Sequence, residues 1–195
     1  MLRREFQKTL NLKHFSWILA AFLLQMTPHW LNADQNNSKL NELFLELKNV
    51  SNPSEASFLE SKIWQIWMEH PLPELSNKLK KGTQAMQTQN FEIALEYFSE
   101  LTREAPEFAE AWNKRATVLF MMGRSKESLF DVARTLELEP RHFGAFSGKG
   151  LILMQYQDWA GAIEAFQEGL KIHPFMPASK NHLEFVIGKQ KETMI

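Results

Sequence analysis

The chain has 195 residues, of which 44% are hydrophobic and 23% are charged, values typical of a globular domain that buries a sizeable core. Its formal net charge is -1, so it lacks the basic surplus on which nucleic-acid binding depends. It contains no cysteine, which excludes disulfides, thiol catalysis and thiolate metal ligands. We therefore expect a protein with no nucleic-acid partner.

Residues 1–33 differ in composition from the rest of the chain. Basic residues precede an apolar run at 15–26, FSWILAAFLLQM, and a polar segment follows it. The run is shorter than the roughly 20 residues of a membrane span, and this order is typical of a secretory signal peptide. We expect 1–33 to be a signal cleaved at Ala33, or an uncleaved anchor that Trp30 and Leu31 extend to the membrane interface. A mitochondrial presequence is the weaker alternative, because the apolar run is less amphipathic than such peptides.

A helical hairpin is predicted for 34–74. Its first helix carries an apolar stripe of Leu40, Leu43, Phe44 and Leu47. The sequence NPSE at 52–55 then supplies a cap, a first-turn proline and a reciprocal acidic residue for a second helix. That helix presents an apolar side that includes Leu59, Ile63, Ile66 and Trp67. We expect the hairpin to cap the repeats that follow, with Trp64 and Trp67 packed against the first of them.

A repeat of 34 residues fills the next part of the chain. Pro106, Pro140 and Pro174 recur at this spacing, and small residues recur with them at one equivalent position, namely Gly82, Ala116 and Gly150. The units are 75–108, 109–142 and 143–176. Regular recurrence at this period predicts three copies of one supersecondary unit.

Each unit has the pattern of two short antiparallel helices. In the second unit Trp112 and Ala116 share one face of the first helix, a turn falls at 122–124, and Val132 lies on the apolar side of the second helix. Pro140 ends that helix. We expect Ala116 to allow a close approach between helices, with the ring of Trp112 filling the space beside it.

The last segment, 177–195, is predicted to be a capping helix that begins at Pro177. Its apolar side, formed by Leu183, Val186 and Ile187, can cover the last repeat. The charged residues that we expect to face water are Lys180, Glu184, Lys189 and Lys191.

These units resemble the tetratricopeptide repeat family, whose pattern combines a tryptophan and a small residue in the first helix, an alanine and an aromatic in the second, and a final proline. The second unit, AEAWNKRATVLFMMGRSKESLFDVARTLELEPRH, carries most of this pattern, and the third carries it with Phe146 in place of the tryptophan. The first unit matches mainly in its second helix, NFEIALEYFSELTREAP. The resemblance implies an all-α fold, a right-handed α-solenoid of three helical hairpins, and a binding scaffold as the type of function.

The resemblance also implies where a partner would bind, because the first helices of such repeats build the inner wall of the superhelix. Met86, Phe120 and Met154 stand in register there, 34 residues apart. Their neighbours along the same wall are Thr83, Thr117, Leu151, Gln87, Met121 and Gln155. An apolar ladder with a polar edge suits an extended apolar peptide or one face of a helix. The alternative is that the three ladder residues contact one another, or the N-terminal hairpin, as core.

One well-known use of the family is excluded by the residues present. Repeat proteins that hold the acidic C-terminus of cytosolic chaperones carry lysine, asparagine and arginine at defined inner-wall positions. This chain has Leu79, Thr83, Lys114, Gly144 and Gly148 at those positions. A carboxylate clamp of that kind is therefore absent.

The acidic residues and histidines form no catalytic or metal-binding pattern in the sequence. The aspartates Asp34, Asp131 and Asp158 lie far apart in the sequence, and no histidine pair has metal-ligand spacing. His70 and His173 each precede a proline at a predicted helix end, where a partial positive charge suits the helix dipole. We expect no enzyme activity, no metal and no cofactor.

Taken with the N-terminal segment, these features predict an exported scaffold of a bacterial cell envelope that binds a protein or peptide, with its oligomeric state open. The alternative is a holdase-like chaperone or cytochrome-assembly subunit that captures unfolded chains. One stoichiometric partner favours the scaffold, and protection of many unfolded clients favours the chaperone.

Overall fold

The computed structural model describes residues 34–193, and within that range every regular element is helical. The signal or anchor predicted for 1–33 lies outside the described residues. The elements are η1 (Asp34–Asn36), α2 (Lys39–Asn49), α3 (Pro53–Trp67), α4 (Pro73–Gln87), α5 (Phe91–Glu104), α6 (Ala109–Met121), α7 (Ser125–Leu138), α8 (Phe143–Gln155), α9 (Trp159–Ile172) and α10 (Pro177–Thr193).

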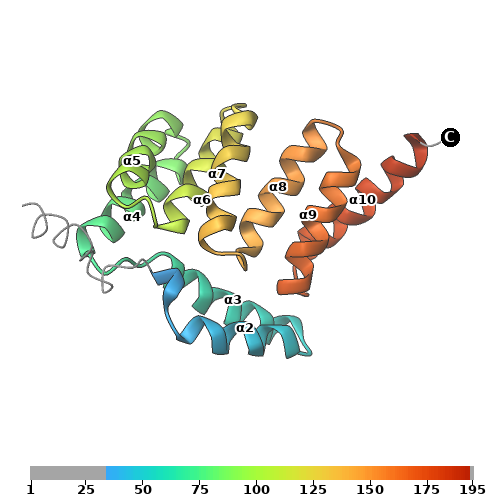
Figure 1. Ribbon diagram of the computed structural model, residues 1–195, viewed down its shortest axis with the longest axis horizontal. Helices are drawn as coiled ribbons and strands as arrows, with labels where there is room; N and C mark the ends of the chain where they lie inside the picture. Colours follow the sequence, from blue (N-terminus) through green and yellow to red (C-terminus); the bar gives the residue numbers. More distant parts are fainter. Residues whose placement is uncertain (1–33, 194–195) are drawn as a thin grey trace, which may run out of the picture. The chain divides into compact units, whose positions relative to one another are not determined.

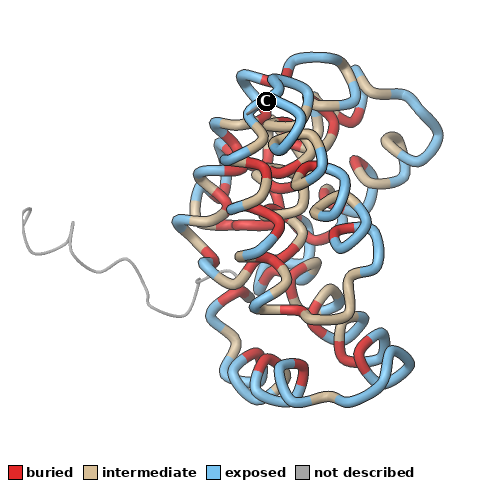
Figure 2. Tube along the Cα trace, turned by 90° about the vertical axis from the view of Figure 1, so that its right-hand side faces the viewer, coloured by how far each residue is buried: buried red, intermediate tan, exposed pale blue. Residues whose placement is uncertain are grey.

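Helices α4 to α9 form three antiparallel hairpins, α4 with α5, α6 with α7, and α8 with α9, each stacked on the next (Figure 1). The hairpins coincide with the three predicted units, so the fold is the expected α-solenoid. Buried residues lie where neighbouring helices face one another, and the outer surfaces are exposed (Figure 2). No helix within 34–193 is both long and apolar enough to cross a bilayer.

The two ends of the repeat array follow the predicted local signals. Asn52 caps α3, because its side-chain oxygen accepts the backbone N–H of Glu55 at 2.9 Å, and Pro53 occupies the first turn. At the other end α10 packs on α9, with Val186 fully buried against Phe166. The capping helix therefore begins and packs as the sequence predicts.

Each repeat turns between its two helices through one residue in the left-handed conformation. These residues are Gln89 (φ 60°), Gly123 (φ 75°) and Gln157 (φ 58°), spaced 34 apart. The next residue in each turn donates its N–H to a carbonyl five residues back, as in Asn90 to Ala85 at 2.9 Å. This arrangement satisfies helix-end carbonyls and reverses the chain in a short loop. Of these three residues only Gly123 indicates the left-handed conformation from the sequence, because glycine adopts it without strain.

The recurring small residue meets the second helix of its own repeat. A Cβ atom on Gly82 would lie 2.6 Å from Phe98 Cε1, and one on Gly150 would lie 2.5 Å from Phe166 Cε1. In the middle repeat the larger Ala116 packs in one core with the smaller Val132. The two positions thus share a nearly constant volume, and glycine is present where the facing residue is phenylalanine.

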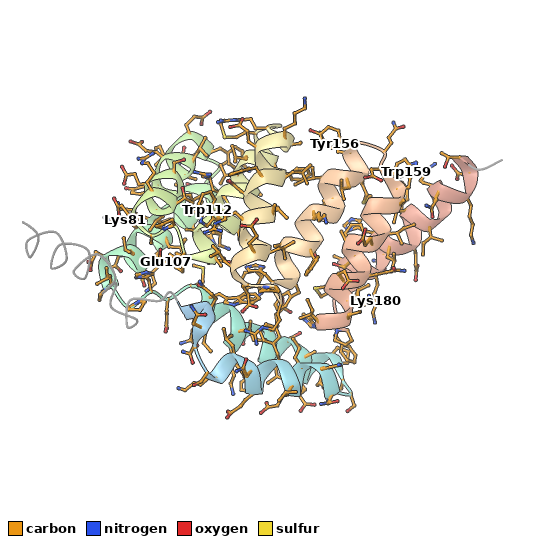
Figure 3. The ribbon with its side chains drawn as sticks, in the orientation of Figure 1. Lys81, Glu107, Trp112, Tyr156, Trp159 and Lys180 are labelled. Carbon is orange, nitrogen blue, oxygen red and sulfur yellow. The ribbon has the colours of Figure 1, made fainter. Side chains whose placement is uncertain are left out.

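Trp112 does not fill the space beside Ala116, contrary to expectation. Its ring is only partly buried, and it packs against the guanidinium of Arg115 at 4.7 Å and the exposed ring of Phe130 at 6.4 Å (Figure 3). Its Nε1 donates to the carbonyl of Pro106 at 2.9 Å. The ring therefore tethers the preceding turn to the outer side of the repeat, and the interlock belongs to Ala116 and Val132.

The N-terminal hairpin packs differently from the prediction. The ring of Trp67 stacks on His142 at 4.1 Å with an interplanar angle of 7°, and Trp64 meets Phe143 edge-on at 5.5 Å. His142 ends the second unit and Phe143 begins the third, so the tryptophans pack at the junction of the second and third repeats and not on the first. Helix α2 also contacts α9. The hairpin consequently runs along the edge of the solenoid where the turns between repeats lie (Figure 1).

Candidate functional site

A hollow of about 220 Å³ opens between α6, α7 and α8 on the wall predicted to bind a partner. Thr117, Phe120 and Leu151 line it, together with Gly148. A Cβ atom built on Gly148 would meet no atom within 4 Å, so the missing side chain leaves the space open. The structure therefore brings three of the predicted groove residues to one apolar hollow.

The ladder residues each join a different core. Met86 packs in the cluster of the first repeat, Phe120 packs with Ala145 and Ile152 of the next repeat, and Met154 packs with the cluster that α10 closes. All three are partly buried. They lie at the seams between successive units, so each side chain serves packing on one side and presents its remaining surface on the other.

The remaining predicted groove residues provide the polar and exposed edge. Met121 is 52% exposed, and the side chains of Gln87 and Gln155 are exposed as well. Gln155 Oε1 accepts the hydroxyl of Ser125 at 2.7 Å. The hydroxyls of Thr83 and Thr117 donate to carbonyls of their own helices, Leu79 at 2.8 Å and Asn113 at 2.9 Å. Three of these polar side chains, Thr83, Thr117 and Gln155, therefore already make hydrogen bonds within the protein.

The positions of the absent carboxylate clamp have other roles here. Leu79 is fully buried, and the ammonium of Lys114 lies 3.1 Å from a carboxylate oxygen of Glu110. Trp64 covers Gly144, where a Cβ atom would lie 2.8 Å from the indole. Gly144 and Gly148 both line the hollow, and neither carries a side chain into it. The wall that would carry cations in a clamp is therefore apolar or already paired.

The hairpin tryptophans cover a buried polar cluster that the sequence did not reveal. Glu110 is 1% exposed, and its Oε2 lies 3.0 Å from His142 Nε2 and accepts Asn113 Nδ2 at 3.0 Å. The other ring nitrogen of His142, Nδ1, accepts the backbone N–H of Ala145 at 3.0 Å and so caps α8. Because Nδ1 accepts, Nε2 carries the proton and donates it to Glu110. This network fixes the turn into α8.

The histidines that precede helices share this role. His173 is fully buried, its Nδ1 accepts the N–H of Phe175, and its Nε2 lies 3.1 Å from Glu60 of α3. Likewise His70 Nδ1 accepts the N–H of Leu72 at 3.1 Å. The helix-dipole interpretation of His70 and His173 is therefore replaced by one in which each ring organises the turn that follows it. Spacing alone could not show this, because Glu60 lies far from His173 in the sequence.

The two carboxylates that face histidines have pKa values below the ordinary one. The hydrogen bond from His173 lowers the pKa of Glu60 and outweighs the effect of burial. Burial raises the pKa of Glu110, but the charge of Lys114 and the hydrogen bond from His142 more than compensate, so this pKa is also lowered. Both carboxylates are accordingly charged in the folded protein at neutral pH.

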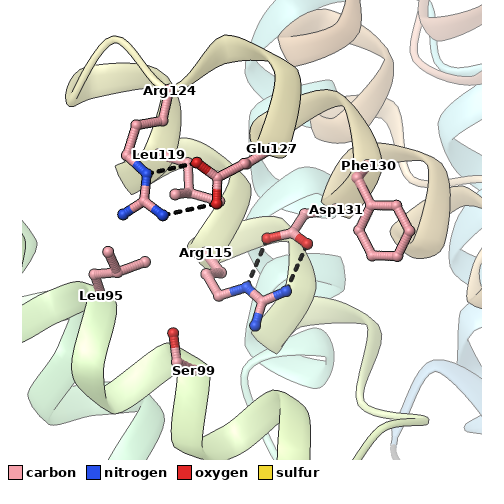
Figure 4. A pocket seen from close by; sticks show the side chains of 8 residues that line it. All are labelled: Leu95, Ser99, Arg115, Leu119, Arg124, Glu127, Phe130 and Asp131. Atoms are coloured by element: carbon pink, nitrogen blue, oxygen red, sulfur yellow. Dashed lines mark hydrogen bonds and ion pairs between the residues drawn. The ribbon is translucent and has the colours of Figure 1, made fainter.

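A further ion pair, in which Asp131 is buried and Arg115 is partly buried, joins α5, α6 and α7 outside the groove hollow. Arg115 binds Asp131 through two parallel hydrogen bonds of 2.7 Å, and its third nitrogen donates to Thr102 at 2.7 Å (Figure 4). Burial raises the pKa of Asp131, and Arg115 acts against that effect. The pair lines a hollow of about 230 Å³, with Arg124 and Glu127 paired at its rim. Both carboxylate oxygens of Asp131 accept hydrogen bonds from Arg115, so Asp131 has a structural role.

Metal chemistry has no evident site in the part of the chain that the structure describes, because no three histidine or carboxylate side chains gather there as ligands. The strongest functional feature of 34–193 is consequently the apolar wall with its hollow. A binding surface of this kind holds a ligand by burial and shape.

Comparison with known proteins agrees with this architecture. A TPR repeat-containing protein from Rhizobium etli is 29% identical over 79% of this chain and 82% of its own length. The Hsp70-Hsp90 organizing protein of Triticum aestivum is 27% identical over 52% of this chain, a match that spans only 18% of that protein. The second similarity therefore concerns a segment and not the whole of the larger protein.

Solved structures share the fold. The Sgt2 TPR domain from Aspergillus fumigatus matches with a TM-score of 0.59 and 24% identity, over 63% of this chain and 83% of that domain. The first TPR of Spaghetti, solved with the HSP90 peptide SRMEEVD, matches with a TM-score of 0.59 and 15% identity, over 60% and 93%. The tetratricopeptide repeat family model matches residues 79–137 and 122–177, which together span half of the chain. The chain therefore belongs to the tetratricopeptide repeat family.

Proposed function

We propose that this protein is a protein-interaction scaffold whose groove binds an apolar segment of a partner protein, as an extended peptide or as one face of a helix. The hollow at Gly148 carries this proposal, because it is an unfilled apolar space beside Phe120 and Leu151 on the wall that the family uses for binding. A side chain of the partner would fill it.

The comparisons support a peptide ligand, and the residues of the wall indicate its chemistry. Spaghetti holds an HSP90 peptide, and TPR2B of yeast Sti1 is described in a complex with Hsp70. Those ligands are not expected for this chain, because Leu79, Gly144 and Gly148 offer no cation and Lys114 is paired with Glu110. An apolar segment suits the wall better than an acidic tail.

The test uses the space at Gly148. Gly148→Leu should fill the hollow without a clash and should abolish capture of the partner recovered by crosslinking from the protein's own cells. The matched control is Gly188→Leu on α10, another helical glycine whose Cβ would meet nothing within 4 Å. Both variants should melt at or above the parental temperature, because glycine disfavours helix by about 1 kcal/mol. Unchanged capture by Gly148→Leu would refute the groove as the binding site.

The same capture separates the scaffold from the chaperone alternative. A scaffold should yield one stoichiometric partner, and its loss should follow Gly148→Leu. Protection of several unrelated unfolded proteins from aggregation, at the same concentrations and without a stable complex, would instead support a holdase or an assembly subunit.

We further propose that residues 1–33 direct export to a bacterial cell envelope, as a cleaved signal or as a membrane anchor. The support is the order of basic, apolar and polar segments in the sequence. Replacing Leu23 and Leu24 by arginine should retain the protein in the cytoplasm, because charge in the apolar run is strongly disfavoured in a membrane. Unchanged fractionation of that variant would refute export through this segment.

A further inference from the structure

A second hollow, of about 430 Å³, lies where α2 of the hairpin meets the solenoid. Phe44 and Leu45 of α2 and Ile172 at the end of α9 form its apolar lining, and Lys48, Arg141 and Lys171 surround them. We name this feature the basic hollow. It is separate from the groove hollow, which is lined by residues of α6, α7 and α8.

The basic hollow is held in shape by Arg141. Its guanidinium binds both carboxylate oxygens of Glu139 at 2.8 Å, donates to Asn41 Oδ1 at 2.8 Å, and covers the ring of Phe44 at 4.5 Å. Glu139 is 2% exposed and cannot meet a ligand. Arg141 therefore joins the hairpin to the turn before α8 and contributes positive charge, while its donors are already occupied.

The two lysines are the cations that can receive a ligand. Lys48 makes no ion pair with any described residue, and its side chain is exposed. Lys171 pairs with Glu168, but both side chains are exposed and three positions apart on one helix. Such a surface pair contributes little and can exchange its carboxylate for that of a ligand. No carboxylate lines the basic hollow itself.

The apolar part is open to solvent. Leu45 is 64% exposed, the largest exposed fraction among the aliphatic side chains of the hairpin that the structure describes. A small molecule held there would keep much of its surface in water, whereas enclosed sites bury most of a ligand. An exposed apolar residue ringed by cations instead suits one large side chain of a longer segment, with acidic neighbours that reach the lysines.

We propose that the basic hollow is a second docking site, for a segment of a partner protein in which a large apolar side chain is flanked by aspartate or glutamate. Charge complementarity favours this occupant. A flat anionic membrane is the less suitable surface, because Glu42 and Glu46 are exposed on the same helix α2, and lipid recognition uses denser clusters of cations. The proposal is independent of the groove, since the two hollows share no residue.

The experiment screens a displayed random peptide library against the full chain. We expect enriched peptides that combine a large apolar residue with neighbouring acidic residues. Lys48→Glu and Leu45→Ser should each weaken their binding about tenfold or more, because one reverses an attractive charge and the other removes the apolar contact. The matched controls lie on α3 at exposed residues outside the basic hollow: Lys62→Glu makes the same charge reversal, and Phe58→Ser likewise replaces an exposed apolar side chain by serine.

Each remaining outcome decides against the proposal. Enriched peptides without acidic residues, or peptides that bind Lys48→Glu and Leu45→Ser as well as the parent, would overturn it. Peptides that lose binding only in Gly148→Leu would overturn it and leave the groove function standing. Binding to anionic phosphatidylglycerol vesicles that Lys48→Glu abolishes, without peptide enrichment, would assign the surface to a membrane. Lys171→Glu on α9 provides the test independently if Lys48→Glu lowers the melting temperature.

Discussion

Replacing Gly150 by alanine tests the volume complementarity between the two helices of a repeat. The added Cβ would lie 2.5 Å from both Cε1 and Cζ of Phe166, whose side chain is fully buried and cannot swing aside. Overpacking of this kind costs about 1 to 3 kcal/mol, and the gain in helix propensity returns about 1 kcal/mol. Gly150→Ala should therefore lower the free energy of unfolding by roughly 0 to 2 kcal/mol.

The control and the compensating variant make the effect specific. Gly188→Ala on α10 meets no atom within 4 Å and should stabilise by up to about 1 kcal/mol. The melting temperatures of the two alanine variants should differ by roughly 2 to 12 °C for a domain of this size. Phe166→Val recreates the pair seen at Ala116 and Val132, so in that background Gly150→Ala should become stabilising.

The assay is thermal and denaturant unfolding of the four variants, followed by circular dichroism. Gly150→Ala that stabilises the parent as much as Gly188→Ala does would show that the contact with Phe166 does not select glycine. An absence of coupling between Gly150→Ala and Phe166→Val would refute the reasoning in the same way.

Three further predictions test the buried contacts. Arg115→Ala should destabilise by about 3 kcal/mol or more, because it leaves Asp131 charged, buried and unpaired, and Asp131→Asn in the same chain should restore part of that loss in urea melts. Trp67→Ala should lower the free energy of unfolding by about 3 to 5 kcal/mol, whereas Trp112→Ala, at a partly exposed ring, should lower it by roughly 1 to 2 kcal/mol. Equal losses in the two variants would contradict the packing described. The lowered pKa of Glu60 contributes stability that is fully present above the ordinary glutamate pKa of 4.5 and is lost as the pH falls through the pKa of the folded state. Glu60→Gln should therefore show a smaller drop in melting temperature on acidification than the parent protein.

The sequence predicts the repeat architecture well because the information is local and recurs. Pro106, Pro140 and Pro174 set the period, and the cap at Asn52 marks a helix start that the structure confirms. The predicted interlock was wrong at Trp112, because helical spacing places Trp112 and Ala116 on one face of the helix but does not say which of the two side chains meets the second helix. Comparison of the facing positions among repeats would have found the answer, since residue size at one position varies inversely with size at the other.

The groove residues were predictable only as a set of positions. Register placed Thr117, Phe120 and Leu151 on one wall, and the structure brings them to one hollow. The hollow itself depends on Gly148, which in the sequence stands out only as a clamp position without a cation. A space left by an absent side chain depends on the distances between three helices, and no spacing rule supplies those distances.

The position of the hairpin has the largest consequence that the sequence could not supply. Repeats in solenoids usually contact only their neighbours, which makes their stability nearly a sum of local terms. Here η1 and the N-terminal hairpin contact the turns that follow the three repeats: Gln35 donates to the carbonyl of Glu107, Trp67 stacks on His142, and Glu60 binds His173.

These contacts tie together turns that lie before α6, before α8 and before α10. A change in the curvature of the solenoid alters the spacing between successive turns, so it would have to break the stack on His142 or the bond to His173. The hairpin thus couples the repeats and resists bending of the wall that carries the groove hollow. Preorganisation of that wall would lower the ordering cost of the binding proposed for the groove, so the hairpin would support the proposed site although it lies outside the groove.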